Sequence, residues 1–252
     1  MKKRYYSLFA AAAMLMATSC SQEEEMVQQS GGDLTTFSVV LDGAVSARTA
    51  GDGMTVDKLY YEVYQGDKKI YDDVKAIASG KTSVELQLMK GETYQITFWA
   101  QNANSIYDAE NLQAIDVDYA TSYSNKEAYD AFFNSFSMKA NGGEKTIYLY
   151  RPFAQLNVGT STADWETAEN LLSLAGKTVA PVSESQVVVK GLANKFNAVT
   201  GKAEGSVTAT FAKAAITAEE FTATAENKSY VNLAMNYLLV PGEEAPKGFN
   251  GT

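Results

Sequence analysis

Residues that commonly perform covalent chemistry are scarce in this chain. Its 252 residues include no histidine and a single cysteine, Cys20. The lack of histidine excludes Ser-His-Asp triads and histidine metal ligands, and one cysteine excludes internal disulfides and cysteine-rich metal sites. Gly80-Lys81-Thr82 and Gly176-Lys177-Thr178 resemble the end of a phosphate-binding loop, but Lys75 and Leu171 stand where that motif needs its first glycine. We therefore predict that both segments are turns.

Acidic pairs are the next candidates, because glycoside hydrolysis uses two carboxylates that flank the scissile bond. The pairs are Asp72-Asp73, Asp116 with Asp118, and Glu219-Glu220. None of them follows a recognisable barrel strand. Asp116 and Asp118 could share a calcium ion, but the glycine and the distal glutamate of an EF-hand loop are missing. We interpret these residues as solvated surface acids, the pair at 116 and 118 in a loop, and predict no catalysis, no metal site and no cofactor.

Aromatic residues offer another chemistry, because a ring can stack on the apolar face of a sugar. The residues considered for a glycan-binding face are Tyr60, Tyr64, Tyr71, Tyr107, Tyr119, Tyr123 and Trp99. Tyrosine is also a favourable strand residue with an amphipathic tip, so packing in a sheet explains the same residues without a ligand. Both interpretations stay open.

The N-terminus has the pattern of a targeting signal. Basic residues 2–4 precede an apolar run at 8–17, which is too short to span a bilayer and has the length of a secretory signal. Small residues lead to Cys20, which resembles the acylated cysteine of a bacterial lipoprotein signal, although Ala17 stands where leucine is usual. We expect residues 1–19 to be removed and Cys20 to carry palmitate and related acyl chains, which give stable anchoring in the outer membrane.

An acidic run follows the predicted lipid site. Its residues are Ser21, Gln22, Glu23, Glu24 and Glu25. In lipoproteins of Bacteroidota a similar run directs export to the outer face of the outer membrane; a solvated tether would have the same composition. The whole chain has a net charge of −9. Removing three basic residues leaves 21 − 3 = 18 basic against 30 acidic groups, a net charge of −12, which argues against nucleic-acid binding.

The body of the chain is dominated by apolar residues at every second position, the pattern of half-buried strands. Predicted strands cover residues 36–41, 59–64, 69–71, 83–88, 94–99, 145–150, 153–158, 186–189, 207–211 and 230–240. Their spacing and the turns between them are typical of an all-β sandwich or barrel. Residues 125–133 are expected to form a short helix or a connecting excursion.

One helix is expected after residue 161. Its apolar residues at helical spacing are Trp165, Ala168, Leu172 and Ala175. Thr162 or Asp164 can cap its first turn, and Gly176 is suited to the position after its end. We predict a short crossover helix that packs on the edge of a sandwich.

Several stretches resemble the fimbrillin-like surface lipoproteins of Bacteroidota, in particular an uncharacterised subgroup. They are Thr97-Phe98-Trp99-Ala100-Gln101-Asn102, Tyr150-Arg151-Pro152-Phe153-Ala154-Gln155-Leu156-Asn157-Val158, Phe196-Asn197 with Thr200-Gly201, and Tyr237-Leu238-Leu239-Val240-Pro241. The resemblance implies tandem transthyretin-like Greek-key β-sandwiches. It also implies a structural or adhesive role at the cell surface, as a fimbrial subunit, fimbrial anchor or related adhesin. The alternative is a surface lipoprotein that binds glycans for a neighbouring uptake system.

The expected organisation has four parts. Residues 1–19 are the signal peptide, 20–33 an acylated flexible tether, 34–150 the first sandwich and 151–252 the second. After residue 151 the pattern gives only four or five strands, fewer than the seven or so of a sandwich. We therefore expect a second sandwich that is truncated or completed by a partner strand, with weak hydrogen-exchange protection beyond about residue 185 and strong protection at 84–100.

Arg48 is a candidate processing site. In polymerising fimbrillins an arginine-specific protease cuts after the first strand, and the emptied groove accepts a strand from the next subunit by β-augmentation. Here Arg48 follows the first predicted strand in a glycine-rich segment, where nicking is expected. An ordinary loop arginine is the alternative.

Overall fold

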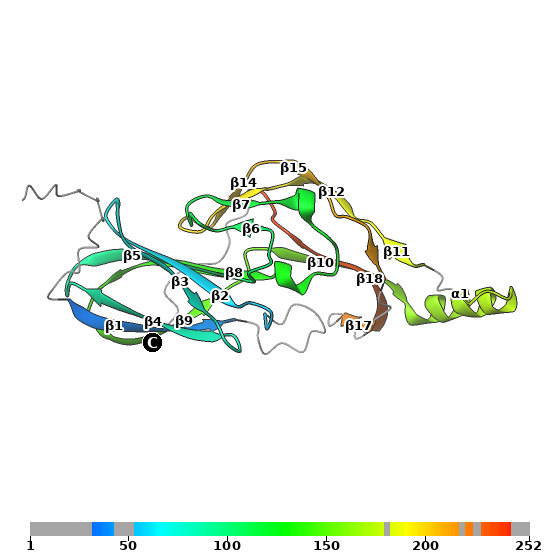
Figure 1. The fold of residues 1–252 in the computed structure, drawn as a ribbon, viewed down its shortest axis with the longest axis horizontal. Helices are drawn as coiled ribbons and strands as arrows, with labels where there is room; N and C mark the ends of the chain where they lie inside the picture. Colours follow the sequence, from blue (N-terminus) through cyan, green and yellow to red (C-terminus); the bar gives the residue numbers. More distant parts are fainter. Residues whose placement is uncertain (1–31, 43–52, 179–181, 217–219, 224–227, 243–252) are drawn as a thin grey trace, which may run out of the picture.

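The structure is a computed structural model that describes residues 32–42, 53–178, 182–216, 220–223 and 228–242. It is an all-β protein with one α-helix and two short 3₁₀ helices in these ranges, η1 (Tyr119–Thr121) and η2 (Glu127–Tyr129). Figure 1 shows a first sandwich at one end of the molecule, a second group of sheets beside it, and α1 at the opposite end. The expected all-β class with a single short helix is therefore confirmed.

The first sandwich has two sheets. One has the order β4-β1-β9, formed by Lys81–Leu88, Asp33–Leu41 and Gly143–Leu149. The other has the order β3-β2-β5-β8, formed by Lys68–Ala76, Lys58–Gln65, Thr93–Gln101 and Ala131–Lys139. The chain crosses between the sheets from β1 to β2, from β3 to β4, from β4 to β5 and from β8 to β9, which is a Greek-key connectivity.

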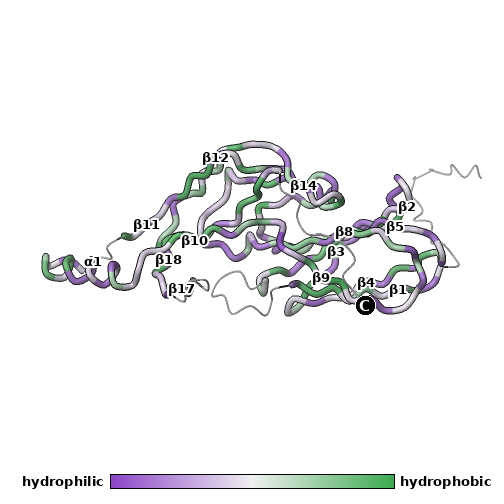
Figure 2. Tube along the Cα trace, turned by 180° about the vertical axis from the view of Figure 1, so that it is seen from behind, coloured by the Kyte–Doolittle hydropathy of each residue, from purple (hydrophilic) through white to green (hydrophobic). Residues whose placement is uncertain are grey.

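The first core lies between these two sheets. Phe37, Val39 and Leu41 of β1 alternate inward and are at most 2% exposed, as the period of two in their sequence predicts. The Phe37 ring lies 5.9 Å from that of Phe98 on β5 and 6.2 Å from that of Phe136 on β8. Each such buried side chain contributes about 1.5–3 kcal/mol. Figure 2 shows hydrophobic segments in both halves of the molecule.

Strand β8 corrects the expectation for residues 125–133. Only Glu127–Tyr129 form a 3₁₀ turn, and the strand Ala131–Lys139 begins directly after it. Residues 131–136 are all buried, because the strand is covered on both faces. A strand covered on both faces loses the alternation of apolar and polar residues that marks a half-buried one. This explains why the sequence pattern did not indicate a strand here.

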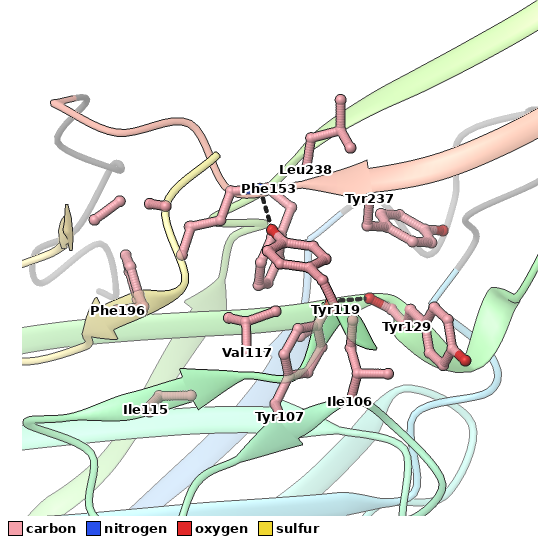
Figure 3. Packing of buried hydrophobic residues seen from close by; sticks show 14 of the residues in the cluster. Ile106, Tyr107, Ile115, Val117, Tyr119, Tyr129, Phe153, Phe196, Tyr237 and Leu238 are labelled. Carbon is pink, nitrogen blue, oxygen red and sulfur yellow. Dashed lines mark hydrogen bonds between the residues drawn. The ribbon is translucent and has the colours of Figure 1, made fainter. Parts of the chain in front are cut away.

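A second core lies on the outer face of the sheet β3-β2-β5-β8. Trp99 of β5 points into it, and its ring lies 5.7 Å from Phe196 and 5.6 Å from Tyr107. Phe133 of β8 points the same way and lies 4.9 Å from Phe196. Tyr107 stacks on Phe153, with ring centres 4.8 Å apart, and the Tyr119 hydroxyl accepts a hydrogen bond from the Leu239 amide. Figure 3 shows part of this core, including Tyr107, Tyr119 and Phe153. The two cores therefore share one sheet.

Four small sheets surround the second core. One has the order β10-β18-β17, formed by Ala154–Ser161, Lys228–Leu238 and Glu220–Ala223. Another has the order β14-β13-β7-β6, formed by Lys202–Glu204, Lys195–Asn197, Ile115–Val117 and Tyr107–Asp108. Two-stranded ribbons pair β12 (Val188–Leu192) with β15 (Val207–Thr210) and β11 (Glu184–Ser185) with β16 (Ala214–Ala215).

The expected count of four or five strands after residue 151 is wrong. The described residues there form nine strand segments, β10 to β18, of which several have only two to four residues and show no periodicity. Strand β7, which precedes residue 150 in the chain, also pairs with β13 across the predicted domain boundary. That boundary stays a prediction, but the second core includes residues 106–119 from its N-terminal side.

Helix α1 spans Thr162–Leu174, as expected. Its N-cap is Ser161, whose Oγ accepts a hydrogen bond from the Asp164 amide, so the predicted caps Thr162 and Asp164 are corrected by one to three positions. Gly176, at φ +70°, ends the helix as predicted: its amide donates to Ser173 O, and the Lys177 amide donates to Leu172 O. Only Trp165 is buried in the helix, which projects from the molecule (Figure 1). Within the described ranges, none of the helices has the length and apolar character needed to cross a bilayer.

Candidate functional site: a tyrosine- and carboxylate-lined cleft

A cleft of about 490 Å³ opens on the outer face of the β2–β3 hairpin. It is lined by Tyr60, Tyr61, Glu62, Asp72, Asp73, Val74, Ala109, Glu110 and Leu112. The hairpin supplies the floor, and the loop between β6 and β7 supplies the opposite wall. Its volume lies within the range usual for small-molecule sites.

Strand pairing places the floor residues. Tyr60 is the cross-strand partner of Val74, and Glu62 is the partner of Asp72. Directly opposed residues in an antiparallel pair share a face of the sheet, so these four side chains lie together on the outer face. Tyr61 and Asp73 form the intervening pair, and the Tyr61 hydroxyl donates to Asp73 Oδ2 over 3.4 Å at the sheet edge.

Glu62 is a buried carboxylate, only 3% exposed, directly opposite another acid. Opposed like charges destabilise a strand pair. Lys69 offsets this repulsion, because its Nζ lies 3.3 Å from Glu62 Oε1 and 2.9 Å from Asp72 Oδ2. The Tyr64 hydroxyl also donates to Glu62 Oε2 over 2.8 Å. The backbone amide of Leu112 donates to Glu62 Oε1 over 3.4 Å, which links the loop wall to the floor.

The tyrosines of the cleft stay protonated at neutral pH. Burial, and then the neighbouring Asp73 carboxylate, raises the pKa of Tyr61 to about 12. Burial and the hydrogen bond to Glu62 raise the pKa of Tyr64 to about 12. Burial also raises the pKa of Tyr60, with smaller contributions from Asp57, Asp108 and Glu110. The cleft therefore presents aromatic rings and hydroxyl donors beside carboxylate acceptors, a set that can hydrogen-bond and stack but contains no nucleophile–base pair.

The structure brings together some of the predicted residues and separates others. Tyr60 and the Asp72-Asp73 pair lie in the cleft, and Tyr64 lies beside it. Tyr71 is half-buried, and its hydroxyl donates to Gln87 O. Tyr107, Tyr119 and Trp99 are core residues, at most 6% exposed, so the proposal that they line a glycan-binding face is wrong. Tyr123, 46% exposed, lies apart from the lining residues of the cleft.

The candidate acids Asp116 and Asp118 do not form a site. Asp116 lies on strand β7 and not in a loop, and it pairs with Lys195 over 3.1 Å. Asp118 caps η1, where its side chain accepts from the Ala120 amide and the Thr121 hydroxyl. Among the residues that the structure describes, no group of three or more His, Cys, Asp or Glu side chains is placed to hold a metal ion.

Gly80 and Gly176 lie in turns, at φ +70° in each case, as predicted. Cys20, the run from Ser21 to Glu25, Arg48 and Glu219 lie outside the described residues. The predictions made for them are therefore untested. The sequence did not indicate that Tyr61 and Glu110 line the cleft. Tyr61 has the pattern of an inward-facing strand residue, and Glu110 lies in a loop that only tertiary packing brings to the hairpin.

A second hollow, of about 610 Å³, lies between β7, η1 and β15. Its lining is apolar or neutral: Val117, Tyr119, Ala120, Asn194, Val207, Thr208, Thr210 and Ala212. Without charged groups or a cluster of exposed rings, it offers less specific chemistry than the cleft.

The fold defines an all-β protein of two cores on a shared sheet with a polar cleft on its surface. The sequence pattern of a family of unknown function, DUF6562, matches residues 28–247. The chain belongs to that family. None of the curated proteins matches the chain significantly.

Solved structures from Bacteroidota are similar in fold. A candidate adhesin from Bacteroides ovatus has 11% identity and a TM-score of 0.47, covering 93% of this chain and 75% of the other. A candidate polysaccharide-binding protein from Bacteroides thetaiotaomicron has 12% identity and a TM-score of 0.47, covering 78% of both chains. The fimbrial anchor protein Mfa2 from Porphyromonas gingivalis has 8% identity and a TM-score of 0.41, covering 84% of this chain and 75% of the other. Similarity at this level carries no argument about function.

Proposed function

We propose that this chain is a non-catalytic structural or adhesive protein of the cell surface, of the fimbrillin-like type, held to the outer membrane by acyl chains on Cys20. The observation that carries the proposal is the placement of β1. This first strand after the predicted tether pairs with β4 from Asp33 to Val40 and with β9 from Thr35 to Leu41. A strand held on both sides, with three residues in the core, transmits a pull on the tether into the whole first sandwich. The stretches of sequence that resemble fimbrillin-like surface lipoproteins support the same class of protein.

Acyl labelling tests the anchor. We expect labelled palmitate to enter the wild-type protein and not Cys20→Ala, and external protease to digest the wild-type protein on intact cells. Replacing Glu23, Glu24 and Glu25 of the acidic run by glutamine should leave the acyl labelling intact and reduce digestion by external protease. Equal labelling of the wild type and Cys20→Ala would contradict the proposal.

The proposed partners are further fimbrial subunits, joined by strand exchange. If β1 left the sandwich after cleavage at Arg48, a groove between β4 and β9 would open over Phe98 and Phe136, both now packed on Phe37. A strand with apolar residues at alternate positions could fill it by β-augmentation. Processed chains would also leave their lipid anchor. We expect N-terminal sequencing of surface material to give chains that start at Thr49, and none in Arg48→Ala; material that always starts at Cys20 would refute processing.

The cleft favours a second candidate function, binding of glycans by a surface lipoprotein. Exposed carboxylates and tyrosine rings are suited to sugar hydroxyls and to the apolar faces of sugar rings. A glycan array separates the two functions, because a purely structural subunit should show no saturable binding. We expect any saturable signal to be lost in Tyr60→Ala and kept in Tyr123→Ala, which removes an exposed tyrosine outside the cleft.

A further inference from the structure

Strand β15 has one backbone edge that the described part of the chain leaves uncovered. On its other side β15 pairs with β12, and just beyond the strand the Phe211 amide donates to Val187 O over 2.9 Å. In an antiparallel pair, successive residues point their backbone N–H and C=O groups to opposite sides. Because Phe211 points its N–H toward β12, Thr210 and Thr208 point their backbone groups to the opposite side.

The chain covers this side of β15 only at the end of the strand. The Ala212 amide donates to Ser122 O over 2.9 Å, and Ala212 forms a parallel bridge with Tyr123. A strand that reached back from Ser122 in the same direction would lie beside Thr210 and Thr208. The preceding residues form the 3₁₀ helix η1 instead. The chain thereby turns away from β15, and among the described residues the two threonines have no ladder partner on this side.

The uncovered edge borders the hollow of about 610 Å³ between β7, η1 and β15. The two threonines line one side of the hollow, and Val117 and Tyr119 line the other. Both walls are held by the fold. The Val117 amide donates to Asn194 O over 2.9 Å, and the Tyr119 ring lies 5.9 Å from the ring of Phe211, edge to face. The hollow is therefore formed before any ligand arrives.

The chemistry of the hollow comes from its backbone. None of its eight lining residues is charged, so the side chains supply no ion pair. The edge offers two N–H and two C=O groups, with the alternate residues about 7 Å apart along the strand. Apolar surface of Val117, Ala120 and Val207 lies beside them. A second extended backbone carries donors and acceptors at the same spacing, which is the basis of peptide recognition by strand addition.

We propose that this hollow binds an extended, uncharged segment of another polypeptide, which adds to β15 as a further strand. The segment pairs with the backbone of Thr208 and Thr210, where η1 has left the edge open. Small aliphatic side chains at alternate positions of the segment face Val117 and Ala120. A charged side chain there would lose hydration without gaining a partner. The site is separate from the groove between β4 and β9, and it rests neither on the lipid anchor nor on processing at Arg48.

Fluorescence anisotropy with the purified full chain tests the proposal. The probe is a labelled peptide of alternating threonine and valine, Thr-Val-Thr-Val-Thr, with both ends blocked. The matched control peptide has the same side chains but is N-methylated at its three central residues, which removes backbone donors from both of its edges. We expect saturable binding of the probe, and binding of the control weaker by at least about fivefold, because each lost hydrogen bond reduces the affinity.

Two pairs of variants locate the site. Thr210→Pro removes an N–H that faces the hollow and leaves the ladder with β12 intact, since proline is tolerated where an edge strand faces solvent. Its control, Thr210→Ala, keeps the N–H. Ala120→Trp fills the hollow, and its control, Ala175→Trp, adds the same side chain at the exposed end of α1. We expect both test variants to weaken binding at least about threefold, and both controls to bind as the wild type does. Circular dichroism checks that each variant is folded.

Four results would overturn the proposal. Equal binding of the two peptides would show that the backbone is not recognised. Unchanged binding in a folded Ala120→Trp would place the peptide elsewhere on the molecule. Displacement of the probe by maltotetraose, a neutral saccharide, would make the hollow a sugar site. Absence of probe binding at millimolar concentration would show that this edge of β15 accepts no strand. Each of these results leaves the proposed surface role in place, because that role is tested by acyl labelling and surface digestion.

Discussion

At the scale of single residues, Arg151 forms an ion pair that links two distant segments of the chain. Its guanidinium donates to both oxygens of Asp130, with Nε distances of 2.8 and 3.1 Å and an Nη2 distance of 2.8 Å. The Asp130 side chain is 1% exposed. The guanidinium also lies 4.6 Å from the centre of the Phe132 ring. The pair connects the start of β8 to the segment that leads from β9 into β10.

Replacing Arg151 by alanine should leave the Asp130 carboxylate buried without its cation. We expect the free energy of unfolding in urea to fall by about 3–5 kcal/mol. Arg151→Lys keeps the charge but loses the two-pronged geometry, so its loss should be smaller. The double variant Asp130→Ala with Arg151→Ala should lose less than the sum of the two single variants. A loss below about 1 kcal/mol in Arg151→Ala would show that the pair has no structural role.

Tyr119 is a second residue whose contribution to the stability of the fold can be measured. Its hydroxyl accepts a hydrogen bond from the Leu239 amide over 3.1 Å, and burial raises its pKa to about 12. The pKa of Tyr119 is therefore higher in the folded than in the unfolded protein. The stabilisation linked to its protonated hydroxyl is complete below about pH 10 and is lost as the pH rises toward 12.

We expect Tyr119→Phe to unfold about 1–2 kcal/mol more easily at pH 8, since the Leu239 amide loses its buried acceptor. The variant should also lose less stability than the wild type between pH 10 and 12. Tyr123→Phe, at an exposed tyrosine, is the control and should follow the wild type at every pH. Identical alkaline profiles for Tyr119→Phe and the wild type would contradict the argument.

At the scale of elements, the strands of the second half differ greatly in how they are held. Strand β18 has eleven residues and pairs with β10 on one side and β17 on the other. Among the described residues, strands β11 and β16 pair only with each other, over two residues each. Local opening is easiest where few backbone bonds and few buried contacts hold a segment.

We therefore expect hydrogen exchange to show strong protection in β5 and in residues 231–238 of β18, and weak protection in β11 and β16. This revises the expectation of weak protection everywhere beyond residue 185, which took no account of the central position of β18. Peptide-level exchange measured by mass spectrometry makes the comparison within one sample, so β5 is the internal reference. Weak protection throughout β18 would restore the earlier expectation of a loose second half.

At the scale of the whole molecule, the two cores are joined through the sheet β3-β2-β5-β8. Phe98 and Phe132 belong to the first core, and their neighbours Trp99 and Phe133 belong to the second. The pairing of β7 with β13 adds a backbone connection between the halves. Loss of either core would expose one face of the shared sheet to water, so the stability of each core depends on the other.

We predict that the chain unfolds in a single cooperative transition. In Trp165→Phe, fluorescence reports only on Trp99, the other of the two tryptophans, which lies in the second core next to the shared sheet. Its urea transition should coincide with that of far-ultraviolet circular dichroism, which reports on all strands. Two separated transitions would show that the halves unfold independently.

The sequence by itself determined the strands whose apolar residues recur at every second position: β1, β2, β4 and β5 lie where the pattern placed them. It also determined the helix and its end at Gly176, where only a residue without a Cβ readily adopts a positive φ. The tertiary structure alone decided β8, β6, β7 and the cleft. Strand β8 is covered on both faces and has no alternation, and β6 and β7 are too short for a period to show. The cleft depends on a contact between Glu62 and the amide of Leu112, fifty residues apart, and local sequence carries no information about which distant loop folds over a given strand.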